Sequence, residues 1–240
     1  MKKLKIVVSL LVVFAFCFGV YSLVSEDEYS YYLVMGDYIS NNQVFDSKEV
    51  ESFSVLVGDY LREEKVVNEV NNGYLKNGMT SKQMLEMVEK GSYKIDDSNL
   101  VDLIKKSKYI TITLGINDVI NQVKYDSLND ELVYDKDVIN NKIEIFKHNY
   151  HQILQEIMDI NSDAKVLLVG CYSLYGDNGI SNLINVATET VAKENNSYYI
   201  DVSDIADTYM YQNNELYLTG LGQKEISRKV ISKIKQIEIS

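Results

Sequence analysis

The sequence predicts an α/β fold in which helices cover both faces of a parallel β-sheet, and two observations support this prediction. Short apolar or β-branched runs alternate with amphipathic stretches from about residue 30 to the C-terminus, as they do in such folds. Two of the runs, residues 109–114 and 166–169, are continuously β-branched or apolar, which is typical of strands buried on both faces.

The alternation predicts the position of each element in order. We expect strands at residues 31–35, 66–70, 109–114, 165–169 and 198–202. We expect helices at residues 48–64, 81–90, 137–160, 180–195 and 219–237. Ser47 is a suitable N-cap for the first helix. Residues 121–136 carry mixed charge without a clear period, so we expect an inserted loop or hairpin after the third strand.

The first 25 residues differ from the rest of the chain. Lys2, Lys3 and Lys5 precede an apolar run at residues 6–24, which is long enough to span a bilayer as a helix. We therefore expect residues 1–25 to form an uncleaved single-pass membrane anchor. A cleaved signal peptide is the alternative, with a weak cleavage site at residues 20–22. Both interpretations place the folded domain, residues 26–240, outside the cytoplasm.

Composition narrows the classes of function. The chain has 240 residues, of which 46% are hydrophobic, and this is enough for one sizeable core. Its net charge of -11 argues against a surface that binds nucleic acid or an anionic membrane. Two cysteines, Cys17 and Cys171, are too few for a disulfide framework, and we interpret both as small hydrophobic residues.

Four short motifs point to a functional site. They are Gly36-Asp37-Tyr38, Asn77-Gly78-Met79-Thr80-Ser81, Leu114-Gly115-Ile116-Asn117-Asp118, and residues 214–222 near the C-terminus. The first and third follow predicted strands, and residues 170–172 follow another. Because ligands of open parallel sheets bind outside the carboxyl ends of the strands, we expect these segments to gather in one cleft.

In this order and spacing the motifs resemble those of the SGNH (GDSL-type) hydrolases, a family of lipases, esterases and polysaccharide deacetylases. The resemblance covers nearly all of the chain after residue 25, and Gly-x-Asn-Asp at residues 115–118 is its most specific match. It implies a three-layer α/β/α, flavodoxin-like fold with a five-stranded parallel sheet. It implies no cofactor and no metal.

The resemblance also assigns roles to individual residues. The family has its serine nucleophile at the position of Tyr38, and it takes oxyanion-hole hydrogen bonds from a glycine N–H at Gly78 and an asparagine amide at Asn117. Its Asp-x-x-His pair falls on Asn214 and Tyr217, counted back from Gly222. The catalytic triad positions therefore lack serine, aspartate and histidine. Four further residues support the motifs, namely Gly36, Asp37, Gly115 and Asp118.

These replacements close the usual route of acyl transfer. A nucleophile needs a neighbouring base to take its proton near neutral pH, and the tyrosine hydroxyl has an ordinary pKa of about 10. The histidines of the chain, His148 and His151, fall on one predicted helix, where a metal pair is a weaker interpretation than ordinary helix residues. Tyr38 as an unusual nucleophile is the catalytic alternative.

The sequence therefore predicts a protein of the cell envelope that is held to the membrane by its N-terminal helix and is catalytically degenerate. Such a protein would bind a glycan, an acyl ligand or an envelope protein, and no nucleic acid. An active esterase or deacetylase that acts on an acylated envelope glycan or lipid with a non-standard nucleophile is the second possibility. An accessory subunit of a larger envelope complex is the third.

Overall fold

The computed structural model describes residues 30–40, 43–45, 48–91, 94–95, 98–126, 131–172, 178–205, 210–211 and 214–239. The predicted anchor or signal segment at residues 1–25 lies outside these ranges, as does the predicted N-cap Ser47. Within the described ranges, no helix combines the length and the apolar character that crossing a bilayer requires.

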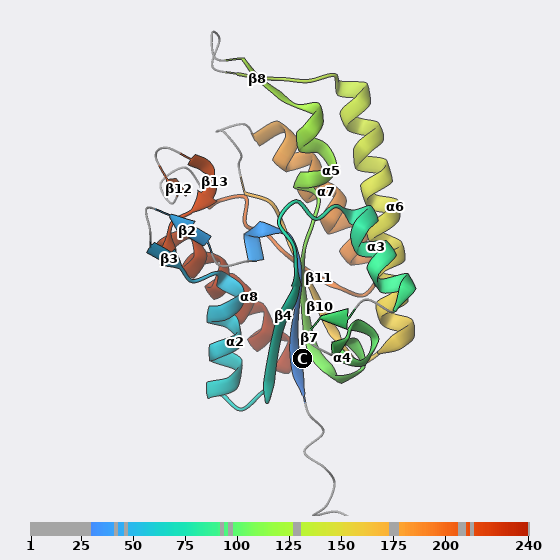
Figure 1. The fold of residues 1–240 in the computed structure, drawn as a ribbon, viewed down its shortest axis with the longest axis vertical. Helices are drawn as coiled ribbons and strands as arrows, with labels where there is room; N and C mark the ends of the chain where they lie inside the picture. Colours follow the sequence, from blue (N-terminus) through green and yellow to red (C-terminus); the bar gives the residue numbers. More distant parts are fainter. Residues whose placement is uncertain are drawn as a thin grey trace, which may run out of the picture.

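A five-stranded parallel sheet forms the centre of the molecule (Figure 1). Its strands are β1 (Tyr31–Gly36), β4 (Glu69–Leu75), β7 (Ser107–Thr113), β10 (Lys165–Val169) and β11 (Tyr198–Ile200). They lie side by side in the order β11-β10-β7-β1-β4, and every neighbouring pair is parallel. This is the flavodoxin-like order. The chain passes from β1 to β4 on one side of it and then crosses to β7 on its other side, so the topological switch point lies between β1 and β7.

Helices cover both faces of this sheet. Helices α2 (Phe53–Glu63) and α8 (Gly220–Ile239) pack together on one face. Helices α3 (Ser81–Lys90), α6 (Lys136–Ile160) and α7 (Asn178–Glu194) cover the other, as Figure 1 shows. Two short helices join this second layer, α4 (Leu100–Lys106) and α5 (Ile116–Val119). The predicted three-layer α/β architecture is therefore confirmed.

Short elements decorate this framework. The 3₁₀ turns are η1 (Tyr38–Ser40) and η2 (Ile120–Gln122). Four two-stranded antiparallel pairs are β2 (Gln43–Phe45) with β3 (Lys48–Val50), β5 (Lys94–Ile95) with β6 (Ser98–Asn99), β8 (Lys124–Asp126) with β9 (Glu131–Val133), and β12 (Met210–Tyr211) with β13 (Asn214–Leu218). The β8–β9 pair is the hairpin predicted for residues 121–136, and it lies at the far end of α5 and α6 in Figure 1.

The first helix begins later than the sequence predicts. Residues 48–50, expected to be helical, instead form β3, and α2 starts at Phe53 with Ser52 as its N-cap residue. The Ser52 side chain makes no capping bond to this helix, and the Phe53 N–H donates to the Gln223 side-chain oxygen at 2.8 Å. A side chain from the far end of the sequence thus takes part in fixing the helix start, and local propensity gives no sign of it.

The second strand was predicted at residues 66–70, but β4 occupies residues 69–75. Lys65 adopts a positive φ of 57°, and the N–H groups of Val66 and Val67 both donate to the Leu61 carbonyl, so these residues end helix α2. The strand then continues through Asn71-Asn72-Gly73, residues with low strand propensity, and its register with β1 shifts there: Asn71 pairs with Leu33 and Tyr74 with Met35. The remaining strands and long helices lie within a few residues of their predicted positions, and α4 and α5 were not predicted.

Candidate functional site

The turn that follows β1 is built against the end of β7. Gly36 has a φ of +131°, and a Cβ atom there would lie 2.3 Å from the Thr113 carbonyl oxygen, so only glycine allows this approach. The Asp37 N–H donates to the Thr113 carbonyl at 3.1 Å and to Thr113 Oγ1 at 3.2 Å. Ser40 Oγ lies 2.9 Å from the same hydroxyl. Thr113 therefore fixes residues 36–40 at the carboxyl edge of the sheet, at the switch point.

The Asp37 side chain points into the protein. It is fully buried, its Oδ1 accepts a hydrogen bond from the Ile39 N–H at 3.1 Å, and its Oδ2 accepts one from Asn117 Nδ2 at 3.2 Å. Burial raises the pKa of this carboxyl to about 7, because the charged form loses its hydration. Asp37 thus supports the turn from beneath.

Asn117 connects three of the predicted motifs. It lies in α5, directly after β7, and its Nδ2 donates to Asp37 Oδ2 and, at 3.1 Å, to the Met79 carbonyl oxygen. A carbonyl only accepts, so the nitrogen side of the amide must face Met79. Both amide hydrogens are therefore used inside the protein. The predicted oxyanion role of Asn117 requires one of these two bonds to be exchanged for a ligand.

Gly78 lies next to the carbonyl that Asn117 binds. It has a φ of +79° in a turn closed by a hydrogen bond from the Met79 N–H to the Lys76 carbonyl at 3.0 Å. The residue is exposed, and a Cβ atom there would meet nothing within 4 Å. The positive φ therefore favours glycine at this position, and steric crowding does not. Its own N–H has no hydrogen-bond partner within the described ranges. Gly78 can therefore offer a donor to solvent or to a ligand.

Asp118 anchors this turn from behind. It accepts hydrogen bonds from the Ser81 N–H at 3.0 Å and from Ser81 Oγ at 2.6 Å, and Asn149 Nδ2 donates to the same hydroxyl at 3.0 Å. Burial raises the pKa of Asp118, while the bonds from Ser81 oppose that shift. Helices α3, α5 and α6 are joined in this way. Ser81 is the last residue of the second predicted motif. Asn149 was not identified from the sequence, because nothing local marks a residue on a distant helix.

Gly115 serves packing. It has a φ of +119°, and a Cβ atom there would lie 2.6 Å from the Ile184 side chain of α7. Glycine thus lets α7 approach the end of β7 closely.

The fourth motif lies on the same edge of the sheet. Gln223, near the start of α8, binds the Phe53 N–H, and the neighbouring Ser54 Oγ donates to the Ser40 carbonyl at 2.5 Å. The start of α8 is therefore tied through the start of α2 to the turn after β1. The side chains of the three triad positions, Tyr38, Asn214 and Tyr217, lie outside the described part of the structure, so their arrangement stays a prediction.

Solved structures share this fold. A lipase, Lip_vut3, from a goat rumen metagenome superposes with a TM-score of 0.63 at 18% identity, over 84% of this chain and 96% of that one. The acetylxylan esterase Axe2 of Geobacillus stearothermophilus, solved as a catalytic mutant, gives 0.61 at 15% identity, over 85% and 93%. A GDSL-like lipase from Parabacteroides merdae gives 0.57 at 11% identity, over 84% and 93%. The chain has an SGNH hydrolase fold. No family model and no curated protein sequence matches it.

One predicted wall of the cleft is buried in this SGNH fold. Cys171 and Tyr172, which follow β10, are 2% and 0% exposed. Asn185 of α7 holds their backbone, because its Oδ1 accepts from the Cys171 N–H at 2.7 Å and its Nδ2 donates to the Cys171 carbonyl at 2.8 Å. Burial raises the pKa of the Cys171 thiol to about 12. The segment belongs to the core, so Cys171 and Tyr172 offer no exposed side chain to the predicted cleft.

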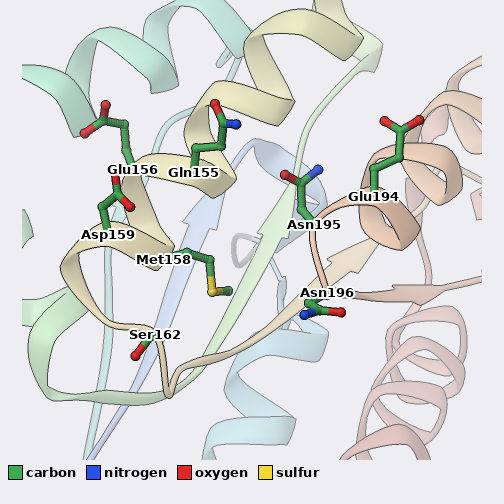
Figure 2. Close-up of a pocket in the computed structure, with 8 residues that line it drawn as sticks. All are labelled: Gln155, Glu156, Met158, Asp159, Ser162, Glu194, Asn195 and Asn196. Carbon is green, nitrogen blue, oxygen red and sulfur yellow. The ribbon is translucent and has the colours of Figure 1, made fainter.

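A surface hollow of about 700 Å³ lies at the opposite edge of the sheet (Figure 2). It lies between the last turns of α6 and the end of α7, before β10 and β11 begin. Its lining residues are Gln155, Glu156, Met158, Asp159, Ser162, Glu194, Asn195 and Asn196. His151 contacts this edge, with Nδ1 2.9 Å from Asn195 Nδ2. The hollow is separate from the motifs, and in the described part of the chain no three His, Cys, Asp or Glu residues are placed to hold a metal.

Proposed function

We propose that this chain is a membrane-anchored, extracytoplasmic protein with an SGNH hydrolase fold that does not perform acyl transfer and instead binds a component of the cell envelope. The placement of the histidines carries the proposal. The chain has only two, both on α6. His148 is exposed to solvent, and His151 contacts Asn195 at the amino edge of the sheet. Neither supplies the base that the fold's hydrolytic chemistry needs at the carboxyl edge.

The residue after Gly36-Asp37 supports the same conclusion. Tyr38 opens η1 directly beyond the end of β1, and the motif resemblance assigns this position to the serine of SGNH hydrolases. Its hydroxyl keeps its proton at neutral pH unless a base or a positive charge lowers its pKa. The nearest described carboxyl group in sequence, Asp37, is buried and engaged with Asn117.

The ligand class follows from the fold and the composition. Two neighbours in structure are an acetylxylan esterase and a phospholipase A1, so this scaffold accommodates acylated sugars and lipids in other proteins. We infer that the site binds an acylated glycan or an acyl lipid of the envelope, and an envelope protein is the alternative partner. The N-terminal apolar run would hold the domain near such ligands.

An esterase assay on the full chain in mild detergent tests the proposal. We expect no turnover of p-nitrophenyl acetate or acetylated xylan above the level of an Asn117→Ala variant. Clear turnover that Asn117→Ala removes would overturn it. If turnover is also lost in Tyr38→Phe while the fold is retained, the alternative of an active hydrolase with a tyrosine nucleophile is the correct one. Co-purification of a stoichiometric protein would instead indicate an accessory subunit.

A further inference from the structure

The Asp37 carboxyl and the Asn117 amide form a contact between the interior and the surface at the carboxyl edge of the sheet. Asp37 is fully buried, whereas Asn117 is partly exposed. The amide nitrogen of Asn117 lies 3.2 Å from Asp37 Oδ2 and 3.1 Å from the Met79 carbonyl oxygen. A ligand oxygen that approaches this amide from solvent must therefore take the place of one of these two acceptors.

The contacts of Asp37 suit a carboxylate better than a neutral carboxyl group. Its Oδ1 accepts from the Ile39 N–H at 3.1 Å, and its Oδ2 accepts from the Asn117 amide. A carboxylate only accepts hydrogen bonds, so its charged form satisfies both donors. In the neutral form one oxygen carries a hydrogen and can itself donate. One of the two N–H groups then faces a weaker acceptor.

Burial and one neighbouring charge decide when Asp37 is neutral. Burial raises the pKa of the carboxyl to about 7, the hydrogen bonds from the Ile39 N–H and the Thr113 hydroxyl oppose this rise, and the charge of Asp118 adds to it. The carboxyl group therefore changes its charge close to neutral pH, where both forms of the protein are stable enough to study.

Two other titratable groups face Asp37 from neighbouring elements. Tyr150 of α6 and Cys171 after β10 are buried, and burial raises the pKa of each, with a smaller contribution from the charge of Asp37. Both side chains therefore stay neutral near pH 7. Burial also raises the pKa of Asp118, while Ser81 and Lys142 of α6 oppose that rise. Asp118 is thus the carboxyl group that an experiment must separate from Asp37.

Loss of the Asp37 charge should release the Asn117 amide and leave the backbone in place. The Ile39 N–H belongs to the turn after β1, which the contacts with Thr113 fix. The Asn117 amide is the end of a side chain and can rotate while its bond to Met79 is kept. Because a hydrogen bond to a charged acceptor is about twice as strong as one to a neutral acceptor, the bond from Asn117 weakens when Asp37 takes up a proton.

We propose that Asp37 is a pH-dependent gate for Asn117: the carboxylate holds the amide inside the protein, and the neutral carboxyl lets it turn to a ligand oxygen at the surface. The inference rests on the proposed binding function of this site and describes its regulation. The carboxylate also places a negative charge behind the amide, which disfavours an electron-rich ligand oxygen there. Ligands held by Asn117 should therefore bind more tightly at acidic pH, and by linkage they should favour the neutral carboxyl.

Hydrogen exchange of the Asn117 side-chain amide tests the gate in the full chain in mild detergent. NMR of isotope-labelled protein follows the amide signal, which Asn117→Ala identifies by its loss. Its exchange rate is compared with that of the exposed Asn141 amide, so that the intrinsic effect of pH cancels. We expect the protection of the Asn117 amide to rise about tenfold from about pH 5.5 to about pH 8.5, because its acceptor gains a charge. The midpoint should lie near pH 7.

A second buried amide in the same protein is the internal control. Asn185 Nδ2 donates to the Cys171 carbonyl, which cannot ionise, so its protection should stay constant over this range. A protection of Asn117 that also stays constant would overturn the proposal. This comparison needs no variant to fold.

Two variants assign the transition to one carboxyl group. Asp37→Asn should leave the Asn117 amide weakly protected at every pH, because the introduced side chain carries no charge. Asp118→Asn should keep the transition and move its midpoint to lower pH, because the charge of Asp118 raises the pKa of Asp37. Circular dichroism checks that both variants fold. A transition that survives Asp37→Asn would overturn the proposal.

The gate and the proposed function can fail separately. Esterase turnover that Asn117→Ala removes, together with a protection of Asn117 that follows pH, would contradict the proposed binding function and support the gate. A constant protection without turnover would contradict the gate and leave the proposed function intact.

Discussion

At the carboxyl edge of the sheet the polar side chains of Asp37, Asn117 and Asp118 point into the protein, whereas at the amino edge four lysines are exposed to solvent, namely Lys105, Lys106, Lys165 and Lys235. In the first region each of these side chains bonds to a group on another element, so its position depends on the whole fold. In the second, the side chains lie at the surface, and their contacts with other elements are limited to rings such as those of Tyr31 beside Lys106 and Tyr60 beside Lys235. The first region should therefore be sensitive to single substitutions, and the second should tolerate them with little loss of stability.

The largest expected effect concerns the buried carboxyl of Asp37. Its pKa in the folded protein is about 7, above the ordinary value of 3.8. The protonated carboxyl therefore stabilises the folded state fully below pH 3.8, and this stabilisation is lost as the pH rises through 7. Asp37→Asn cannot ionise. We expect the unfolding free energy of the variant, relative to the wild type, to rise by about 4 kcal/mol between pH 4 and pH 8. Urea unfolding across this range measures it, and a parallel response in both proteins would refute the buried charge.

A slightly smaller effect is expected from Gly36→Ala. The new methyl group would collide with the Thr113 carbonyl, and the φ of +131° disfavours any side chain. We expect a loss of about 3 kcal/mol in unfolding free energy. Gly220→Ala is the control, since its Cβ atom would lie 3.9 Å from the nearest side chain, and it should change stability by less than about 0.5 kcal/mol. Similar losses in both variants would contradict the close approach of β1 to β7.

Restoring the triad tests whether the carboxyl edge remains a catalytic scaffold. Tyr38→Ser, Asn214→Asp and Tyr217→His together should raise the turnover of p-nitrophenyl acetate about 100-fold over the wild type, which corresponds to roughly 2.7 kcal/mol of barrier. The matched control is the double variant Tyr38→Ser, Asn214→Asp, which lacks the restored histidine. A folded triple variant without turnover would show that the fourth motif is misplaced by our counting from Gly222.

The smallest effect is expected for the support of the Gly78 turn. In Asp118→Asn the side-chain oxygen can still accept from the Ser81 hydroxyl, but the NH₂ group faces the Ser81 N–H, which is also a donor. The substitution also removes the negative charge that strengthens both hydrogen bonds. We expect a loss of about 1–2 kcal/mol, measured by chemical denaturation. Asp163→Asn, an exposed acid on the opposite edge, should be nearly neutral. If the two variants behave alike, Asp118 does not hold α3 in place.

Elements with a strong periodic pattern were predicted well. The strand Lys165–Val169 and the helix Ser81–Lys90 have the predicted bounds, and the hairpin within residues 121–136 is present. Errors occurred where distant contacts decide the backbone. The start of α2 depends on Gln223, and β4 runs through Asn71-Asn72-Gly73 between two residues that pair with β1, Asn71 and Tyr74. Neither contact leaves a local trace in the sequence.

The sequence alone determined the order of the elements and the SGNH-like motifs, because these properties belong to residue types and their spacing. That serine, aspartate and histidine are missing from the triad positions, Tyr38, Asn214 and Tyr217, stays a prediction from the spacing of these motifs. Tertiary structure alone decided that both hydrogens of the Asn117 amide are used inside the protein and that Tyr172 belongs to the core. Such properties depend on which atoms meet across the fold. For this reason the Gly-Asp-Tyr motif identifies the scaffold, while its hydrogen-bond partners decide what that scaffold can offer to a ligand.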